Sequence, residues 1–367
     1  MLIILLVLIG LSFLIFAHEA AHFFMAKSFG LKVDEFGFGF PPRIFAIKKG
    51  DTEYSLNWIL FGGFVKIAGE NGEFEMLEPS GAEIDSKKGN ADFLERGLGK
   101  NENSAPNVLF FFTQSAWKKS LIVLAGVMMN FVLGWLLISS ALMIGTPKAV
   151  VVTDIEPNSP EAAVGIQSGD AVKGYATVQE VIDYVNAHRG QPIALDLLRN
   201  AKDITVTVTP RIVTTPGEGA VGIGLADAGS PREAPFPALR DGFLASIGMF
   251  GAIVVAFGGL IKEIFVHASL PAGVVGPVGI FGVAEETGKI GLVYLLQFIG
   301  IISINLSVVN LIPFPALDGG RFVMVVIEKI KGSALSKKIE MWVNGFGFAF
   351  LLLLMLLLTI RDVWNLW

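Results

Sequence analysis

The sequence contains no cysteine among its 367 residues and only four histidines. Disulfide bonds and thiolate ligands are therefore excluded, so any bound zinc must take nitrogen and oxygen ligands. Charged residues make up 17% of the chain, and the net charge of -5 gives no reason to expect nucleic acid as a partner. The hydrophobic content of 53% and the mean hydropathy of +0.62 are too high for an ordinary soluble protein. We therefore expect several membrane spans together with a soluble domain.

The first hydrophobic stretch, Leu2 to Lys27, is long enough to cross a hydrocarbon core of about 30 Å at about 1.5 Å per residue. It places His18, Glu19 and His22 at membrane depth, where ionisable side chains are costly and usually functional. The H-E-x-x-H spacing puts both imidazoles on one helix face, within reach of one zinc ion. We predict that His18 and His22 bind zinc and that Glu19 is the catalytic base that takes a proton from the attacking water. The competing interpretation is that these are polar residues buried between helices.

Four more apolar segments are candidate spans, namely Trp117–Ile144, Phe243–Ile261, Gly291–Ile312 and Phe346–Ile360. Basic residues flank the loop after the first span and the loop before the last, so both loops are predicted to be cytoplasmic. Five crossings would place these loops on opposite sides of the membrane. We therefore predict four transmembrane helices, at 1–29, 117–145, 291–318 and 340–362. The segment 240–267 is Gly-rich and flanked by charges, and we expect it to lie at the surface or to enter only partway.

Residues 33–68 are predicted to form short strands of a membrane-associated β-hairpin region. Gly37, Gly39, Gly62 and Gly63 interrupt any helix, and large apolar residues alternate with polar ones. This region directly follows the helix with His18, Glu19 and His22, which suggests that it lines one side of the metal site. An exposed strand edge there could pair with an extended substrate. A hairpin with packing duties alone is the alternative. Residues 70–107 are polar and charged, and they are predicted to be a loop.

Residues 148–226 are predicted to be a soluble α+β module in the order strand, turn, helix, strand, turn, strand. The stretch SPEAAVGIQSGDAV resembles a PDZ domain, a family whose members bind extended peptides or chain ends in a groove between a strand and a helix. The predicted fold class is thus a multi-pass α-helical membrane protein with a β-hairpin region and one PDZ-like domain.

The stretch NLIPFPALDGG closes the third predicted span. Pro313 and Pro315 end the regular helix, and Asp318 follows. Two imidazoles need a third ligand and an aspartate at membrane depth needs a cation, so we predict that Asp318 is the third zinc ligand. Helix capping beside the glycine pair is the alternative. Asn310 is predicted to hydrogen-bond to the substrate backbone or to the carbonyl oxyanion, although a helix–helix hydrogen bond is an equally open interpretation.

The motifs HEAAH, LAGVMMN, GPVGI and NLIPFPALDGG, with the PDZ-like insert, resemble the site-2 protease family. More narrowly, the chain is similar to its bacterial PDZ-containing branch, the regulator of sigma-E proteases. The resemblance implies an intramembrane zinc metalloprotease with one zinc per chain, which cuts transmembrane segments of proteins such as anti-sigma factors. The matching positions are the zinc ligands His18, His22 and Asp318, the base Glu19 and the substrate-binding Asn310.

The resemblance further implies that residues 37–65, with Gly62 and Gly63 among the substrate-binding positions, provide a strand that receives the unwound substrate. It implies the bacterial cytoplasmic membrane, with the PDZ-like domain outside. The basic loops and the shared direction of the first and third spans independently predict that the active site lies towards the cytoplasmic half of the lipid bilayer. Two other functions stay open. One is a membrane-anchored zinc peptidase of soluble or misfolded proteins, and the other is a non-enzymatic PDZ scaffold or transporter-like protein.

Overall fold

The computed structural model describes residues 2–70, 110–146, 148–155, 165–199, 202–213, 219–267, 276–333 and 335–365. The predicted loop at 70–107 lies outside the described residues except for Glu70. The chain folds as two compact units, which are described separately. One unit comprises residues 12–129 and 309–351, and the other comprises residues 1–11, 130–308 and 352–367.

Helix α1 (Leu2–Ser28) carries the H-E-x-x-H motif, and its regular course follows from an apolar sequence without proline. The helix ends where Gly30 adopts φ +75° and the Leu31 N–H donates to the Ala26 carbonyl at 3.0 Å. Its last turns pack against residues 116–129 of helix α3 (Ala116–Ile144). The shared apolar core is formed by Phe23, Ala26, Leu31, Val33, Phe36, Ile67, Phe111, Ile122 and Val123.

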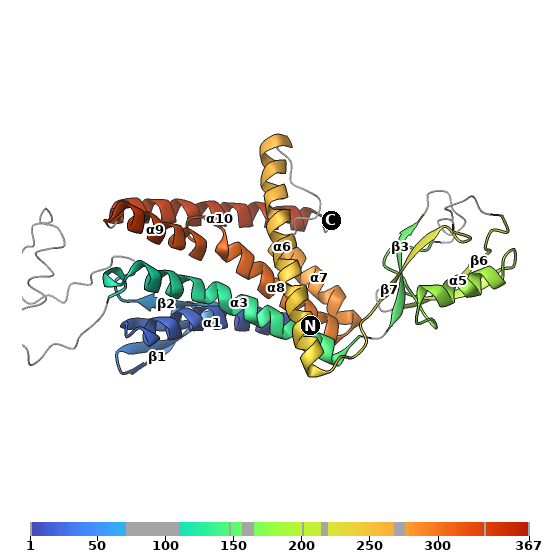
Figure 1. The fold of residues 1–367 in the computed structure, drawn as a ribbon, viewed down its shortest axis with the longest axis horizontal. Coiled ribbons are helices and arrows are strands. Elements are labelled where there is room, and N and C mark those ends of the chain that lie inside the picture. The colour runs from blue at the N-terminus through green and yellow to red at the C-terminus, as the bar shows by residue number, and fades with distance from the viewer. Residues whose placement is uncertain are drawn as a thin grey trace, which may run out of the picture. The chain divides into compact units, whose positions relative to one another are not determined.

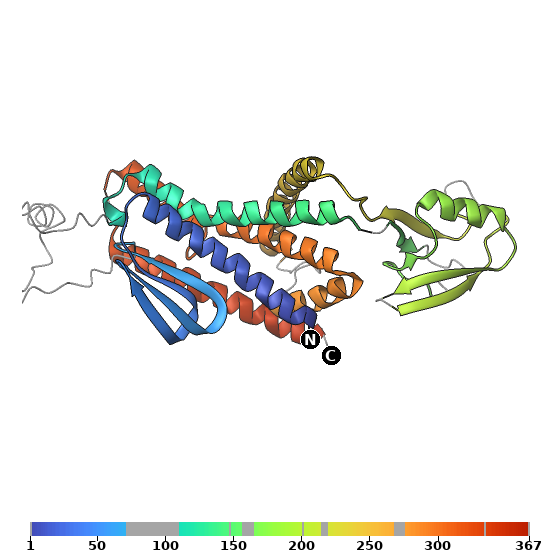
Figure 2. The same cartoon turned by 90° about the horizontal axis from the view of Figure 1, so that it is seen from below.

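Strands β1 (Val33–Lys49) and β2 (Thr52–Ile67) pair antiparallel and lie against α1 (Figures 1 and 2). Both strands bend, so that residues 33–38 pair with 63–67 on one side and with 53–56 on the other. Gly39 at φ +82° lies in the bend of β1, and Gly62 at φ +118° lies in the bend of β2. The segments run in the order 43–49, 52–57, 33–38 and 63–67 across the sheet. Within the described chain no further strand pairs with the outer side of residues 63–67, which therefore form a sheet edge.

In the same unit, a short 3-10 helix η1 (Phe111–Thr113) precedes α3, and helix α9 (Asp318–Lys331) precedes α10 (Lys337–Asn365). The predicted span 291–318 is wrong at its end, because helix α8 (Leu292–Leu311) stops before Pro313. Asp318 is instead the first residue of α9. The sequence analysis predicted no helix there, although the amphipathic spacing of residues 318–331 is the pattern of a helix with one buried face.

The second unit contains the 149–228 module, whose five strands lie in the order β6-β5-β4-β3-β7. These are β3 (Ala149–Ile155), β4 (Ala171–Val172), β5 (Ile193–Arg199), β6 (Lys202–Val208) and β7 (Ile223–Ala228). Helix α5 (Val178–Ala187) starts at the Thr177 side chain, which accepts from the Glu180 N–H at 3.3 Å. Alternating apolar residues of the strands pack beneath α5, with Val150, Leu195 and Leu197 almost fully buried.

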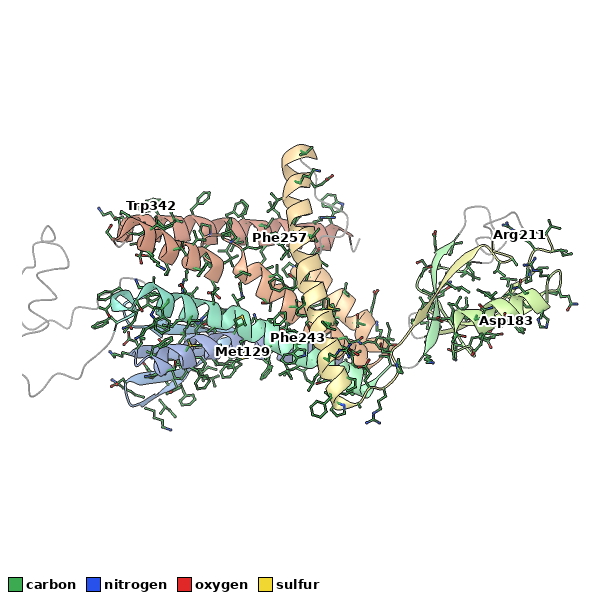
Figure 3. All side chains as sticks on the ribbon, viewed as in Figure 1. Met129, Asp183, Arg211, Phe243, Phe257 and Trp342 are labelled. Carbon is green, nitrogen blue, oxygen red and sulfur yellow. The ribbon has the colours of Figure 1, made fainter. Side chains whose placement is uncertain are left out.

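Helix α6 (Pro235–His267) follows the module and crosses the C-terminal half of α3 (Figure 1). Phe243, labelled in Figure 3, packs edge-to-face on Phe131 and Trp135. The Trp135 indole N–H also donates to the Leu239 carbonyl at 2.8 Å. The helix has 33 residues and is longer than the apolar segment Phe243–Ile261, so its length does not prevent it from crossing a membrane.

Helix α7 (Pro277–Ile290) was not predicted either, because its sequence is rich in glycine and begins with Gly276-Pro277. Proline at the first helical position is compatible with a helix start, and the Asp362 carboxylate of α10 accepts from the Gly276 and Gly279 N–H groups at 3.1 and 2.8 Å. Val7, Ala284 and Leu295 form the core between α1, α7 and α8. Five described helices, α1, α3, α6, α8 and α10, are long and apolar enough to span a membrane.

Candidate metal centre

The two histidines of α1 lie on one face of the helix, as their spacing predicts. His18 and His22 are both buried, with exposed fractions of 7% and 8%, and their Nε2 atoms are 3.2 Å apart. The Nδ1 atom of His22 lies 2.7 Å from the Ile122 carbonyl oxygen of α3. Because a carbonyl oxygen only accepts, this contact fixes the proton on Nδ1 and leaves the Nε2 lone pair pointing into the site.

The start of α9 brings Asp318 to the same point. Its Oδ2 atom is 3.0 Å from Nε2 of His18 and 3.3 Å from Nε2 of His22. The glycines that follow make this approach possible, since a Cβ at Gly319 would lie 2.3 Å from the Leu311 and Ile312 carbonyl oxygens. A Cβ at Gly320 would similarly overlap the Phe314 carbonyl. The LDGG sequence thus lets the first turn of α9 pack directly on the end of α8.

Three donor atoms therefore converge from two elements that are far apart in sequence. Ligands at about 2.0–2.1 Å from a tetrahedral zinc ion would be about 3.3 Å from one another, close to the three separations found here. The Oδ2 atom of Asp318 is buried and accepts no hydrogen bond within the described part of the chain. A buried carboxylate oxygen facing an imidazole lone pair is unfavourable without a cation. The donor set fits a zinc ion.

Gly126 of α3 leaves the room that such an ion needs, a role that the sequence analysis missed. A Cβ at this position would lie 2.4 Å from Nε2 of His22 and 2.7 Å from Nε2 of His18. Any side chain here would therefore enter the space between the imidazoles. Nothing in the local sequence distinguishes one packed glycine from another, so Gly126 could not be singled out before the imidazoles were placed.

Glu19 lies between the two histidines in sequence and beside the edge of the sheet in space. A Cβ added to Gly63 would be 3.5 Å from Cγ of Glu19, so the side chain passes over the backbone at the start of the edge residues 63–67. The Glu19 carboxylate is close enough to His18, His22, Asp318 and Arg321 to interact with their charges. The Glu19 carboxylate thus lies next to the three donor residues His18, His22 and Asp318 without being one of them.

The remaining predicted site residues lie on neighbouring elements. Asn310 is half-buried in the last turn of α8, and its amide makes no hydrogen bond to any described residue. Gly62 and Gly63 are buried at the bend of β2. None of these three residues belongs to the converging donor set of His18, His22 and Asp318, and Gly63 approaches Glu19.

Two partly buried ion pairs involve α9, the helix that begins at Asp318, and sequence reasoning missed both. Arg321, one helical turn after Asp318, pairs at 2.5 Å with Glu70, which lies three residues after the end of β2. The Glu70 carboxylate raises the pKa of Arg321 above its ordinary value. Lys119 of α3 pairs with Glu328 of α9 at 3.1 Å. These partners are distant in sequence, so no local pattern could have revealed them.

The chain is similar in sequence to known peptidases over most of its length. A family model described as peptidase family M50 matches residues 6–354. The chain is 31% identical over 409 residues to the zinc metalloprotease RasP of Geobacillus kaustophilus, covering 95% of each protein. It is 31% identical over 361 residues to a putative zinc metalloprotease of Clostridium perfringens, covering 97% of each. It is also 28% identical over 411 residues to the regulator of sigma-W protease RasP of Bacillus subtilis, covering 96% of each.

Proposed function

Because the chain belongs to peptidase family M50 and is a zinc metalloprotease, we propose that it hydrolyses peptide bonds within or next to transmembrane segments of other membrane proteins. The predicted family, enzyme class and zinc cofactor are thereby confirmed. The observation that carries the proposal is the convergence of His18, His22 and Asp318 beside Glu19 on a helix that is apolar enough to span a membrane.

The proposed chemistry assigns one role to each group. Zinc, when bound by His18, His22 and Asp318, supplies a Lewis acid that polarises the scissile carbonyl and acidifies water. The Glu19 carboxylate accepts the proton of the attacking water and then delivers it to the leaving amine nitrogen. The carbon–oxygen bond forms as the carbon–nitrogen bond breaks. The amide of Asn310 donates to the substrate carbonyl oxygen or backbone.

The sheet edge supports a way to present the substrate. A helical substrate hides its carbonyl groups in hydrogen bonds, so it must unwind before cleavage. The edge formed by residues 63–67 offers unpaired backbone groups to an extended chain, and Gly63 at its start approaches Glu19. We therefore assign Gly62 and Gly63 to substrate binding, because they lie at the end of this edge that is nearest to Glu19.

The membrane context is partly established and partly proposed. The five apolar helices and the family place the chain among integral membrane proteins. We propose four crossings in the cytoplasmic membrane of a bacterium, with α6 at the surface or partly inserted. The active site then faces the cytoplasmic half of the bilayer. The 149–228 module is proposed to be a PDZ-like domain on the outer side that reads or filters substrates.

Anti-sigma factors are the proposed substrate class. One relative is named a regulator of sigma-W protease, and this name supports a substrate that controls a sigma factor. The test compares cleavage of a transmembrane reporter with cleavage of soluble casein by the purified protein in detergent, with Glu19→Gln as the inactive control. We expect cleavage of the reporter alone. Cleavage of casein but not of the reporter would favour a membrane-anchored peptidase of soluble proteins.

A further inference from the structure

The turn before Asp318 has an unusual backbone. The Leu317 N–H donates to the Phe314 carbonyl at 3.2 Å, so Phe314 to Leu317 form a β-turn with Pro315 and Ala316 at its centre. Ala316 has φ +71°, and it is the only non-glycine residue with a positive φ in the described chain. This is the φ of the third residue of a type II turn, a position that glycine or asparagine usually takes. Alanine is disfavoured there because its Cβ crowds the backbone.

One face of α10 holds this turn. The side-chain oxygen of Asn344 accepts a hydrogen bond from the Ala316 N–H at 3.3 Å. Gly347 packs so closely on Pro315 that a Cβ would lie 2.6 Å from the Pro315 oxygen, and the rings of Phe350 and Phe314 are 5.5 Å apart. The three α10 residues recur at intervals of three and so lie along one side of the helix.

The hydrogen bond from Asn344 selects the form of the turn. Type I and type II turns differ by a flip of the peptide between their two central residues. In this turn that peptide joins Pro315 to Ala316, and its N–H is the group that Asn344 binds. A flip to type I would give Ala316 a negative φ of about −90°, which alanine prefers, but it would turn the N–H away from α10. Asn344 thus opposes the local preference of the chain.

We propose that Asn344 is a positioning residue for the metal site, which holds the turn in its type II form and thereby aims the carboxylate of Asp318 at His18 and His22. Asp318 follows Ala316 by two residues, and its Oδ2 atom lies within 3.3 Å of both imidazoles. A reoriented turn would therefore move the Asp318 carboxylate away from His18 and His22. Asn344 is not among the three residues whose donor atoms converge, and it acts through the turn that it binds. The inference rests on the proposed role of Asp318 as a zinc ligand.

Zinc affinity of the full-length protein in detergent, measured by competition with a chelator, tests this inference. Asn344→Leu removes the acceptor, and we expect the affinity to fall by about 10–100-fold, as is common for residues that orient metal ligands. Asn344→Asp keeps an acceptor oxygen and should bind zinc within a few-fold of the unmodified protein. The decisive variant combines Asn344→Leu with Ala316→Gly. Glycine adopts a positive φ without support, so this second change should restore most of the affinity.

A matched control is Trp342→Leu, which changes a side chain that is 79% exposed at the surface of the same helix (Figure 3) and should leave zinc affinity unchanged. The inference is overturned if Asn344→Leu binds zinc as tightly as the unmodified protein, or if Ala316→Gly gives no recovery. If Asn344→Leu cannot be purified, Asn344→Ala takes its place under the same criteria. Failure of the proposed function would look different, because the unmodified protein would then bind zinc but leave the transmembrane reporter uncut.

Discussion

The two halves of the metal site are built in opposite ways. His18, Glu19 and His22 lie on an uninterrupted helix, so their relative positions follow from helical geometry alone. Asp318 follows a turn that depends on two prolines, a positive φ at Ala316 and a glycine pair without room for side chains. The relative positions of the residues in the first half can therefore be predicted from the five-residue motif HEAAH. The second half depends on contacts with α8 and α10, which a motif cannot describe.

The largest effect on cleavage is expected when the base is removed while the zinc ligands of both halves, His18, His22 and Asp318, are kept. Glu19→Gln should lower the rate of reporter cleavage by about 10²–10⁴-fold, because general base catalysis contributes about that much. Zinc content should stay at the level of the unmodified protein, since Glu19 is not in the converging donor set. Cleavage rates and metal analysis of the same preparations check this, and cleavage at the normal rate would contradict the assigned role.

A second test acts on the helical half from outside. Gly126→Ala places a methyl group 2.4 Å from Nε2 of His22, so zinc affinity should fall by about 10-fold or more. Gly345→Ala is the matched control, because a Cβ there meets nothing within 4 Å. Chelator competition on both variants gives the comparison. Equal affinities would show that the space beside Gly126 is not needed for the ion.

The corresponding test of the turn half is Gly319→Ala. The new methyl group would lie 2.3 Å from two carbonyl oxygens, so α9 must shift, at a cost of about 1–3 kcal/mol in the free energy of unfolding. We expect a lower thermal midpoint together with weaker zinc binding, whereas Gly126→Ala should act mainly on zinc. If Gly319→Ala left both quantities unchanged, the close packing of α9 on α8 would not be needed for the site.

A smaller effect is expected where the hairpin meets α9. Glu70→Gln and Arg321→Gln should each raise KM for a transmembrane substrate while leaving zinc content unchanged, because the pair ties the end of β2 to the helix of Asp318. In the double-mutant cycle, the coupling should be about 0.5 kcal/mol, a low value because the Arg321 side chain is 38% exposed. Additive effects on KM would mean that the two residues act independently.

The smallest effect on the site is expected from the 149–228 module. Burial opposes the charge of Asp170, but hydrogen bonds from Arg199 and the Gln167 N–H hold the pKa of this carboxyl below its ordinary value. The charge therefore stabilises the module above the unfolded-state pKa of about 3.9, and this stabilisation is lost as pH falls through the folded-state pKa. Asp170→Asn should make the module more sensitive to limited proteolysis at pH 7, with a smaller difference near pH 4. Zinc affinity should not change.

The sequence predicted the parts of the fold that depend on local periodicity. The helix containing 117–145, the hairpin region at 33–68, and one helix and three strands of the module appear near their expected places, whereas strands β4 and β7 were not predicted. Helices α7 and α9 were missed, since glycine and proline at their starts resemble loop signals. The pairing of residues 33–38 with both 53–56 and 63–67 was also missed. A glycine such as Gly39 or Gly62 does not by itself indicate from the sequence that the strand bends there.

The same division holds for the site. The predicted His18, His22 and Asp318 come together, but the residues around them were not found from the sequence. Gly126 is distinguished only by the imidazoles that it faces, and Asn344 only by the turn that it contacts. Both act across elements that are distant in the chain, and a single sequence gives no information about such contacts.

The most direct measurement is the zinc content of the purified protein beside its His18→Ala and Asp318→Ala variants. We predict about one zinc per chain in the unmodified protein and loss of that zinc in both variants, because the two halves share one ion. A variant that kept its zinc would show that its residue is not a ligand. Zinc retained in Asp318→Ala alone would contradict the central claim that the turn before α9 completes the site on α1.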